Sequence, residues 1–292
     1  MILITGATGT TGRALIAALS ERGTPVRALV HTAEKAAGIA GPGIEIAIGD
    51  LAQPDTLDRA LVGVERAYLL TPSSPGQVEL EGNFIAAAVR VGGPHIVKHS
   101  VVGADPRASG RLARWQGQAE QALAASGLPA TVLRPNFFMQ GTFAFAPTIA
   151  AHGAFYLPQK DGCISYVDVG DIAAVAAVVL TGTGYVGKTY DITGPASLSN
   201  DEVAATLTQA LGKAVAYVDI SPDDTAAALR GAGLPDWYAD GLVELYVAAS
   251  TGQYAEVTTV VADIARRQPT SFARFAHAHA AAYGHAPVGA GR

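Results

Sequence analysis

The chain has 292 residues, of which 49% are hydrophobic and only 15% are charged, so a large core is available and disorder is not expected. Twenty Lys and Arg against 25 Asp and Glu give a net charge of −5, which argues against nucleic-acid binding through a broad basic face. The single cysteine, Cys163, excludes an internal disulfide framework and a cysteine-based zinc site. No stretch has the composition of a membrane span. We therefore expect a cytoplasmic protein.

Short β-branched runs alternate with stretches of helical period from the N-terminus onward, which predicts a parallel sheet with crossover helices. The expected strands are almost continuously apolar, as in a sheet that is covered on both faces. In chain order, strands are expected at residues 2–5, 26–30, 44–48, 66–70, 96–101 and 131–133. Helices are expected at 13–21, from 54 onward, at 78–91 and at 112–125.

After Pro135 the pattern becomes irregular. Short strands are expected at 155–157, 164–167 and 190–193, and helices are expected to start at Ser199, which opens a Ser-x-x-Glu capping box, and at Ser221. We predict an α/β fold, a Rossmann-type doubly wound parallel sheet with a smaller α+β C-terminal substrate lobe. The expected division is a dinucleotide-binding domain at 1–150, completed by the helix at 168–181, a smaller lobe at 151–285 and a flexible tail at 286–292.

A glycine-rich loop, Gly6-Ala7-Thr8-Gly9-Thr10-Thr11-Gly12, follows the first strand, and its last glycine opens the first helix. A pyrophosphate needs backbone N–H donors, the positive end of a helix and no side chain in its way, and a strand–loop–helix arrangement supplies all three. The alternative is an ordinary glycine-rich turn. The position of the loop directly between strand and helix favours dinucleotide binding.

The end of the second strand indicates which dinucleotide is bound. It reads Val30-His31-Thr32-Ala33-Glu34-Lys35, with no carboxylate at the strand end itself, where NAD enzymes usually carry Asp or Glu. His31, Thr32 and Lys35 suit a 2′-phosphate, so we expect NADP(H) in preference to NAD(H); an ordinary solvated loop is the alternative. Asp50 is expected beside the adenine, and a loop-capping role would explain it as well. The expected cofactor-binding residues are Thr5, Gly6, Thr8, Gly9, Thr10, Thr11, Gly12, His31, Lys35, Asp50, Leu51, Thr71, Pro72, Ser73, Ser100, Pro135 and Asn136.

Five segments make the chain similar to the NmrA-like group of atypical short-chain dehydrogenases, which includes reductases of triphenylmethane dyes and of quinones. The segments are GATGTTG at 6–12, GDLAQPDTL at 49–57, KHSVVGA at 98–104, SGLPATVLRPNFFMQ at 126–140 and YVDVGDIA at 166–173. The resemblance covers about residues 1–283 and implies a Rossmann domain with a smaller substrate domain.

The usual acid of short-chain dehydrogenases is missing. Typical members carry Tyr-x-x-x-Lys on the helix before the sixth strand, but residues 112–121 contain neither residue, and Gln116 stands where many relatives have a histidine. The literal match at 156–160 contains Pro158 and lies outside the expected dinucleotide domain. Because a positioned general acid contributes about 10²–10⁴ in rate, acceptors that need no protein-delivered proton are favoured, such as quinones and conjugated aromatic compounds.

Polar residues at strand ends are the remaining candidates for the chemistry. Ser100, Gln116 and Asn136 are expected to position the reactants, although Ser100 and Asn136 could serve structural roles instead. His99 is expected in the core. Phe137, Phe138 and Met139 are expected to contact the substrate, with core packing as the default alternative.

The sequence therefore predicts an enzyme, an NADPH-dependent reductase that transfers hydride to a quinone-like or conjugated aromatic small molecule. The alternative is an NADP(H)-binding, redox-sensing regulatory protein without turnover, because the resembling group includes such sensors. No nucleic-acid or membrane partner is expected. The histidines at 277 and 279 would not share a helical face, so no metal site is expected. A homodimer is a possible assembly, although no residue pattern specifies it.

Overall fold

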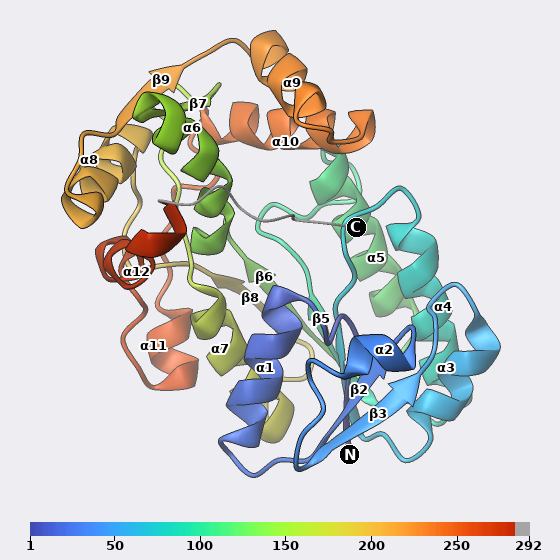
Figure 1. Cartoon of the computed structure of the whole chain (residues 1–292). Helices are drawn as coiled ribbons and strands as arrows, with labels where there is room; N and C mark the ends of the chain where they lie inside the picture. Colours follow the sequence, from blue (N-terminus) through green and yellow to red (C-terminus); the bar gives the residue numbers. More distant parts are fainter. Residues whose placement is uncertain (284–292) are drawn as a thin grey trace. The chain divides into compact units, whose positions relative to one another are not determined.

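The computed structural model describes residues 1–283 (Figure 1). Two compact units are present. The first comprises Met1–Pro135, Val169–Ile192 and Val260–Arg266, and the second comprises Asn136–Asp168, Thr193–Thr259 and the described residues from Arg267 onward. The main segment of the first unit thus ends at Pro135 rather than at the expected 150, and its segment Val169–Ile192 includes the helix that was expected at 168–181 to complete this domain. The tail expected at 286–292 lies outside the described residues.

The first unit contains a seven-stranded parallel sheet with the strand order β3-β2-β1-β4-β5-β6-β8. The predicted Rossmann-type fold is confirmed, because this order reverses between β1 and β4, as in dinucleotide-binding sheets. The strands are β1 (Ile2–Ile4), β2 (Val26–Val30), β3 (Ile44–Ile48), β4 (Arg66–Leu69), β5 (His95–His99), β6 (Ala130–Pro135) and β8 (Thr189–Ile192).

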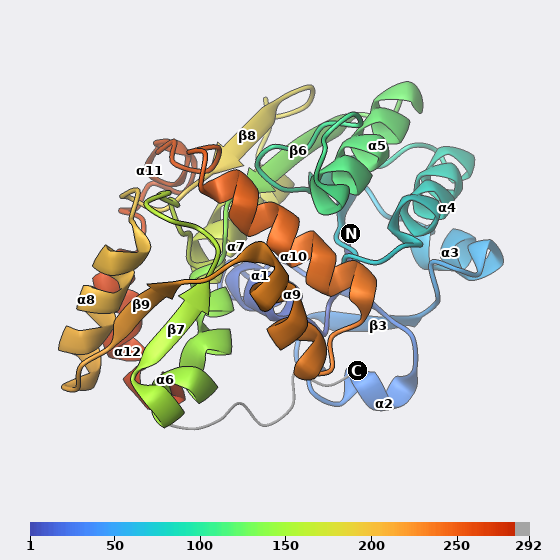
Figure 2. The same cartoon turned by 90° about the horizontal axis from the view of Figure 1, so that it is seen from above.

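Helices cover both faces of this sheet (Figures 1 and 2). One face carries α1 (Thr10–Ser20), α7 (Val169–Thr181) and α11 (Val260–Ala265), and the other carries α3 (Pro54–Leu61), α4 (Gln77–Arg90) and α5 (Arg111–Ala125), while the short α2 (Ala33–Ala36) follows β2. The apolar stripe of α1, formed by Leu15, Ile16 and Leu19, is buried. Nine of the 13 residues of α7 are buried as well, as expected for a helix that packs on the sheet.

Strand β8 was expected as residues 190–193 of the smaller lobe, and this assignment is wrong. Val132 of β6 pairs with Thr189, and Pro135 pairs with Ile192, so β8 extends the parallel sheet of the first unit. The reason is that α7 supplies the crossover that a parallel neighbour of β6 requires. The segment 164–167 forms only isolated bridges, Phe138 with Val167 and Ile164 with Leu198, rather than a strand.

The second unit combines two short strands and several helices with aromatic packing. It contains η1 (Met139–Phe145), α6 (Ala146–His152), β7 (Ala154–Leu157), α8 (Asn200–Leu211), β9 (Ala216–Asp219), α9 (Pro222–Gly231), α10 (Asp236–Ala249), α12 (Phe272–Ala278) and η2 (Ala280–Tyr283), and β7 pairs with β9 in parallel. Phe145 stacks on Phe155 with ring centroids 4.5 Å apart. The predicted capping box is confirmed, because Ser199 Oγ accepts from the Glu202 N–H and the Glu202 carboxylate accepts from the Ser199 N–H.

Among residues 1–283, no helix combines the length and the apolar character that crossing a bilayer demands.

Candidate functional site

The glycine loop lies at the point where the strand order of the sheet reverses, which is where sheets of this type bind ligands. Thr5 Oγ1 donates to Leu70 O at 2.7 Å and accepts from Leu70 N at 2.8 Å. These bonds tie the carboxyl end of β1 to that of β4. The Thr5 hydroxyl is therefore used within the sheet, and it holds the glycine loop beside the residues that follow β4.

Two of the three glycines are required by the loop itself. Gly6 has φ of +60°, in the left-handed region that favours glycine. A Cβ on Gly12 would lie 2.2 Å from Gly6 O, so the first turn of α1 approaches the loop more closely than any side chain permits. Gly9 differs, because its φ is −77° and a Cβ there would meet only Gly6 O at 3.4 Å. The protein itself therefore leaves room for a side chain at Gly9.

The N-terminus of α1 is suited to an anion. Gly9 is the N-cap residue, no side chain caps the helix, and the first turn carries no acidic residue. The first N–H groups of a helix need acceptors, and the positive end of the helix dipole favours negative charge. The loop and helix therefore fit a dinucleotide pyrophosphate, to which the backbone N–H groups of residues 10 and 11 would donate.

The carboxyl ends of β2 and β3 present His31 and Asp50 side by side. His31 Nδ1 lies 3.7 Å from Asp50 Oδ1, and the His31 side chain is 57% exposed. Asp50 Oδ1 also accepts from the Ala52 N–H at 2.9 Å, so Asp50 does cap its own loop, and a contact with adenine remains a prediction. Lys35, in the short α2, is exposed.

Arg13 belongs to this region and was missed by the sequence reasoning. Its Nε donates to Thr8 O at 2.8 Å and its Nη1 donates to Gly38 O at 2.6 Å. The exposed guanidinium thus bridges the glycine loop and the segment that follows β2. The one sequence signal for its role was a basic residue directly after the last glycine of the loop. Its partner Gly38 is 25 residues away, and no local sequence pattern predicts a contact over that separation.

A buried polar network lies between β4, β5, α4 and α5. Glu81 and Lys98 form an ion pair at 3.0 Å, and both side chains are 0% exposed. Glu81 Oε1 accepts from Thr71 Oγ1 at 2.5 Å and from Gln77 Nε2 at 3.0 Å. Lys98 Nζ donates to Gln116 Oε1 at 2.6 Å and to His99 O. The network connects Thr71 with Gln116, two residues that the sequence placed in the site.

Ser100 belongs to a second, separate set of contacts. Its hydroxyl donates to Glu120 Oε1, and the same carboxylate forms a two-point ion pair with Arg134, at 2.9 Å to Nε and 2.5 Å to Nη2. The hydrogen bonds that the Arg134 guanidinium donates to Glu120 raise the pKa of this guanidinium above its ordinary value. This arrangement favours the structural alternative for Ser100, because its hydrogen is directed at Glu120.

His99 lies in the core, as expected. Its Nδ1 is 2.6 Å from the hydroxyl of Tyr68, and both side chains are buried. Burial lowers the pKa of His99 to about 3, with a smaller contribution from the charge of Lys98. The imidazole is therefore neutral, and burial also raises the pKa of Tyr68. At neutral pH the Tyr68 hydroxyl therefore keeps its proton, and the imidazole takes up none.

Asn136 and the residues after it lie in the second unit. Asn136 Nδ2 donates to Ser165 Oγ at 2.7 Å and to Tyr254 O at 2.8 Å, while its Oδ1 accepts from the Phe137 N–H at 2.9 Å. Both N–H donors of the amide are used internally, which favours the turn-fixing alternative for this residue. Phe137 packs against Tyr254 and Tyr246, with ring centroids 5.1 and 6.0 Å apart.

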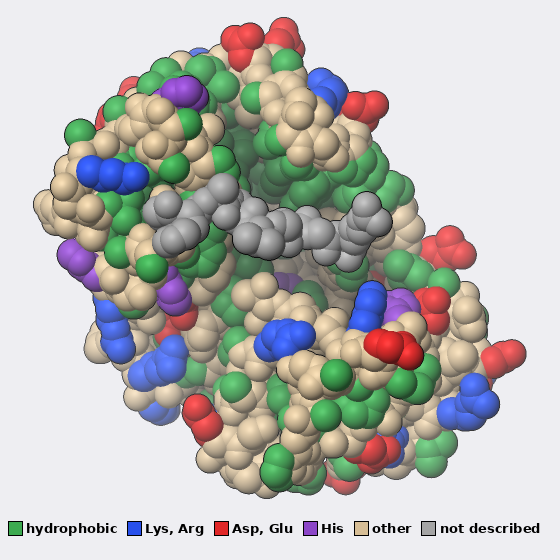
Figure 3. Space-filling view, in the orientation of Figure 1, with side chains coloured by type: hydrophobic (Ala, Val, Ile, Leu, Met, Phe, Trp, Pro, Cys, Tyr) green, Lys and Arg blue, Asp and Glu red, His purple; other side chains and the backbone are tan. Residues whose placement is uncertain are grey.

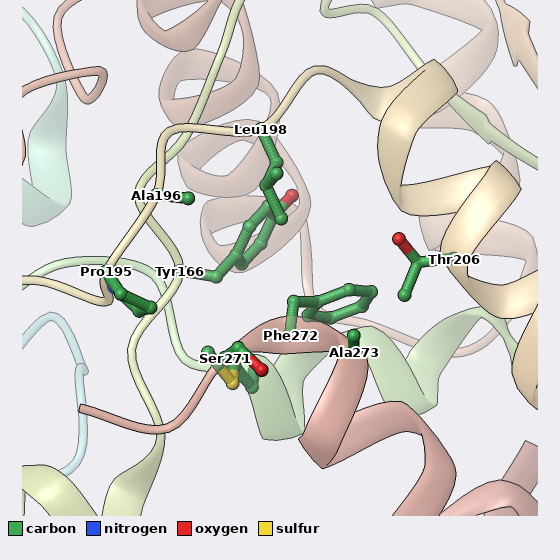
Figure 4. A pocket seen from close by; sticks show the side chains of 9 residues that line it. Tyr166, Pro195, Ala196, Leu198, Thr206, Ser271, Phe272 and Ala273 are labelled. Atoms are coloured by element: carbon green, nitrogen blue, oxygen red, sulfur yellow. The ribbon is translucent and has the colours of Figure 1, made fainter. Parts of the chain in front are cut away.

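A small apolar pocket lies within the second unit, between the loop at 195–198, α8 and the start of α12 (Figure 4). Its volume is about 160 Å³, below the roughly 300–1,000 Å³ of drug-sized ligand sites. The lining residues are Met139, Tyr166, Pro195, Ala196, Leu198, Thr206, Ser271, Phe272 and Ala273. Met139, expected at the substrate, thus faces a space that is too small for a polycyclic dye.

The literal Tyr-x-x-x-Lys match is not a catalytic pair. Tyr156 lies in strand β7, and Lys160 follows in a turn with φ of +49°. Within residues 1–283, no group of three or more His, Cys, Asp and Glu side chains is arranged to hold a metal ion. On the face shown in Figure 3, basic side chains are dispersed among acidic ones.

Comparisons with known proteins agree with this geometry. The model of the NmrA-like family matches residues 1–276. An NAD(P)H azoreductase of Xenophilus azovorans is 40% identical over 284 residues, which are 97% of this chain and 99% of the relative. The NADPH-dependent quinone oxidoreductase of Escherichia coli, solved in complex with NADPH, has a TM-score of 0.88 and 34% identity, and the match covers 94% of this chain and 98% of that one. The triphenylmethane reductase of Citrobacter sp., complexed with NADP(H), has a TM-score of 0.85 and 26% identity over 96% and 100% of the two chains.

Proposed function

The chain belongs to the NmrA-like family, and we propose that it is an NADPH-dependent reductase of quinone-like and conjugated aromatic compounds. The observation that carries the proposal is the uncapped N-terminus of α1 beside a glycine loop at the reversal point of the sheet. Relatives that share nearly the whole chain are reductases that use NAD(P)H or NADPH. NADPH would supply a hydride, which is two electrons with one proton.

The proposed cofactor site is formed by the ends of four strands. The glycine loop from Gly6 to Gly12 would hold the pyrophosphate, and Asp50 and Leu51 would lie beside the adenine. Thr71, Pro72 and Ser73, which follow β4, would lie along the ribose and nicotinamide. Thr5 and Thr71 support these loops through their own hydrogen bonds, so we assign them a positioning role rather than a direct one through their hydroxyls.

A preference for NADPH over NADH rests on the charges around the end of β2. Arg13, Lys35 and His31 are exposed there, and Arg13 is held in place by its two bonds to backbone carbonyls. A guanidinium is permanently charged and has five donors in a fixed fork, of which these bonds use two. The remaining donors suit a phosphate on the 2′-hydroxyl.

The class of acceptor follows from the missing acid. The α5 helix carries Gln116 in place of a tyrosine or histidine, and the nearby Ser100 and Lys98 are held in internal contacts. A quinone becomes a stabilised phenolate-type anion after hydride transfer, and a cationic triphenylmethane dye becomes a neutral product, so neither needs a proton from the protein. An ordinary ketone would give a strongly basic alkoxide, so it is expected to react poorly.

The test is to mix the purified protein with NADPH and a panel of acceptors, namely a benzoquinone, a naphthoquinone, an azo dye, a triphenylmethane dye and a simple ketone. We expect loss of the nicotinamide absorbance with the conjugated acceptors and little with the ketone. Tight binding of NADPH without oxidation by any acceptor would instead favour a regulatory protein. The homodimer and the cytoplasmic location stay predictions from the sequence.

A further inference from the structure

The buried pair of Glu81 and Lys98 lies at the same edge of the sheet as the glycine loop. Lys98 Nζ donates to the carbonyl of His99, the last residue of β5, and Glu81 holds Thr71, which stands two residues beyond the end of β4. Strand β4 is the neighbour of β1, whose end carries the glycine loop. Two fully buried charges therefore lie near the carboxyl ends of β4 and β5, in contact with Thr71, which we propose lies along the ribose and nicotinamide.

Neither charged group is free to react. The ammonium of Lys98 has three N–H donors, and three oxygen atoms surround it, one each from Glu81, His99 and Gln116. The carboxylate of Glu81 is used by Lys98, Thr71 and Gln77. Lys98 thus cannot serve as a proton donor to a substrate without breaking the network, which leaves a role in positioning its neighbours.

The orientation of the Gln116 amide is decided by Lys98. An ammonium can only donate, so the Gln116 atom that faces it at 2.6 Å must be the oxygen Oε1. The nitrogen Nε2 occupies the other branch of the planar amide, and its two N–H donors point away from Lys98. The positive charge also draws electron density toward Oε1, which makes the N–H groups stronger donors.

We infer that Gln116 stabilises the negative charge that forms on the acceptor and that Lys98 and Glu81 are positioning residues that hold its amide in this orientation. The inference rests on the proposed reductase function. NADPH would supply the hydride, and its C4–H bond would break as a bond from that hydrogen to the acceptor forms. The electron pair displaced from the acceptor π system ends on a quinone oxygen or an azo nitrogen.

The Gln116 N–H groups hydrogen-bond to this oxygen or nitrogen as its charge develops. An amide cannot release a proton at neutral pH, so the anion afterwards takes its proton from water, which balances the reaction. Donors that are fixed before the reaction act in the same way as the donors of an oxyanion hole. The acceptors that suit such a site carry a carbonyl or azo group conjugated to an aromatic ring.

The first test is Gln116→Glu. The new carboxylate still accepts from Lys98, but the two N–H donors are lost, so we expect kcat with a benzoquinone to fall by about 100-fold or more. Affinity for NADP⁺, measured by calorimetry, should stay within about twofold, because Gln116 acts on the acceptor. Gln118→Glu, on the same helix, is the matched control and should keep the wild-type kcat.

The second test is the double variant Glu81→Gln/Lys98→Met. It removes both charges, keeps a carbonyl acceptor for Thr71 and Gln77, and takes away the ammonium that orients Gln116 and donates to His99 O. Paired removal of buried charges is often tolerated, so the melting temperature reports whether the fold is intact. We expect kcat to fall about tenfold, because the amide is then free to rotate. In a Gln116→Glu background the same pair of changes should have no further effect on kcat.

The outcomes separate the inference from the proposed function. No oxidation of NADPH by wild type with any acceptor refutes both. Turnover by wild type together with an unchanged kcat in Gln116→Glu overturns the inference alone. A large loss of NADP⁺ affinity in Gln116→Glu also overturns it, because it would place Gln116 at the cofactor. Equal effects of the double variant in both backgrounds would show that Lys98 and Glu81 do not act through Gln116.

Discussion

Two substitutions in the glycine loop should have opposite consequences, although they are only three residues apart. A Cβ on Gly12 would lie 2.2 Å from Gly6 O, 2.8 Å from Ala7 Cα and 2.9 Å from Gly6 C. All three are backbone atoms, so Gly12→Ala forces the loop away from α1. A Cβ on Gly9 meets only Gly6 O at 3.4 Å, an ordinary contact. We therefore expect Gly12→Ala to damage the fold and Gly9→Val to damage mainly cofactor binding.

The expected magnitudes follow from these contacts. Forcing a methyl group into packed backbone costs about 3 kcal/mol, which corresponds to a fall in melting temperature of about 6–12 °C. Gly9→Val replaces a favourable N-cap residue at a cost of about 1 kcal/mol, or about 2–4 °C. Its side chain, however, covers the N–H groups of the first turn. Loss of two charge-assisted hydrogen bonds at about 1.5 kcal/mol each lowers NADPH affinity by about 100-fold or more.

Thermal unfolding with and without NADP⁺, together with calorimetric titration, measures both effects on the same samples. Wild-type affinity in a folded Gly9→Val protein would refute the assignment of the pyrophosphate to this loop. An unchanged melting temperature in Gly12→Ala would show that α1 does not pack against the loop as closely as described.

Three further predictions concern charge and hydrogen bonding. Arg13→Met should lower the affinity for NADPH about tenfold and the affinity for NADH little, because it removes one charge-assisted contact. Arg22→Met is the control in parallel titrations. Equal losses of affinity for both cofactors would contradict a 2′-phosphate contact. His99 has a pKa of about 3 in the folded state and about 6.5 in the unfolded state. The contribution of this group to stability is therefore fully present above pH 6.5 and is lost as the pH falls toward 3. Urea unfolding should therefore show about 2 kcal/mol less stability at pH 5 than at pH 7 from this group, and His99→Gln should show a smaller difference; the same pH dependence in both proteins would refute the assignment. Asn136→Ala should lower the free energy of unfolding by about 2–3 kcal/mol through the loss of three buried hydrogen bonds. A urea midpoint of this variant equal to that of the wild type would show that these bonds do not stabilise the second unit.

The sequence alone was sufficient for features that are local along the chain. The apolar strands, their alternation with amphipathic helices, the glycine loop and the Ser199 capping box are each written in a few neighbouring residues. The same holds for the missing acid, because the presence or absence of a Tyr-x-x-x-Lys pattern can be read directly from neighbouring residues. For this reason the class of fold, the place of the loop and the exclusion of Tyr156 and Lys160 as an acid pair could be predicted before the structure.

Only the tertiary structure decided which distant residues meet. Lys98 pairs with Glu81 and orients Gln116, Arg13 reaches Gly38, and β8 joins the sheet beside β6. No periodicity encodes such contacts, because they depend on how strands and helices pack rather than on spacing along the chain. Ser100 and Asn136 each stand where a catalytic side chain could lie. A partner from another element determines where their hydrogens point: Glu120 for Ser100 and Ser165 for Asn136.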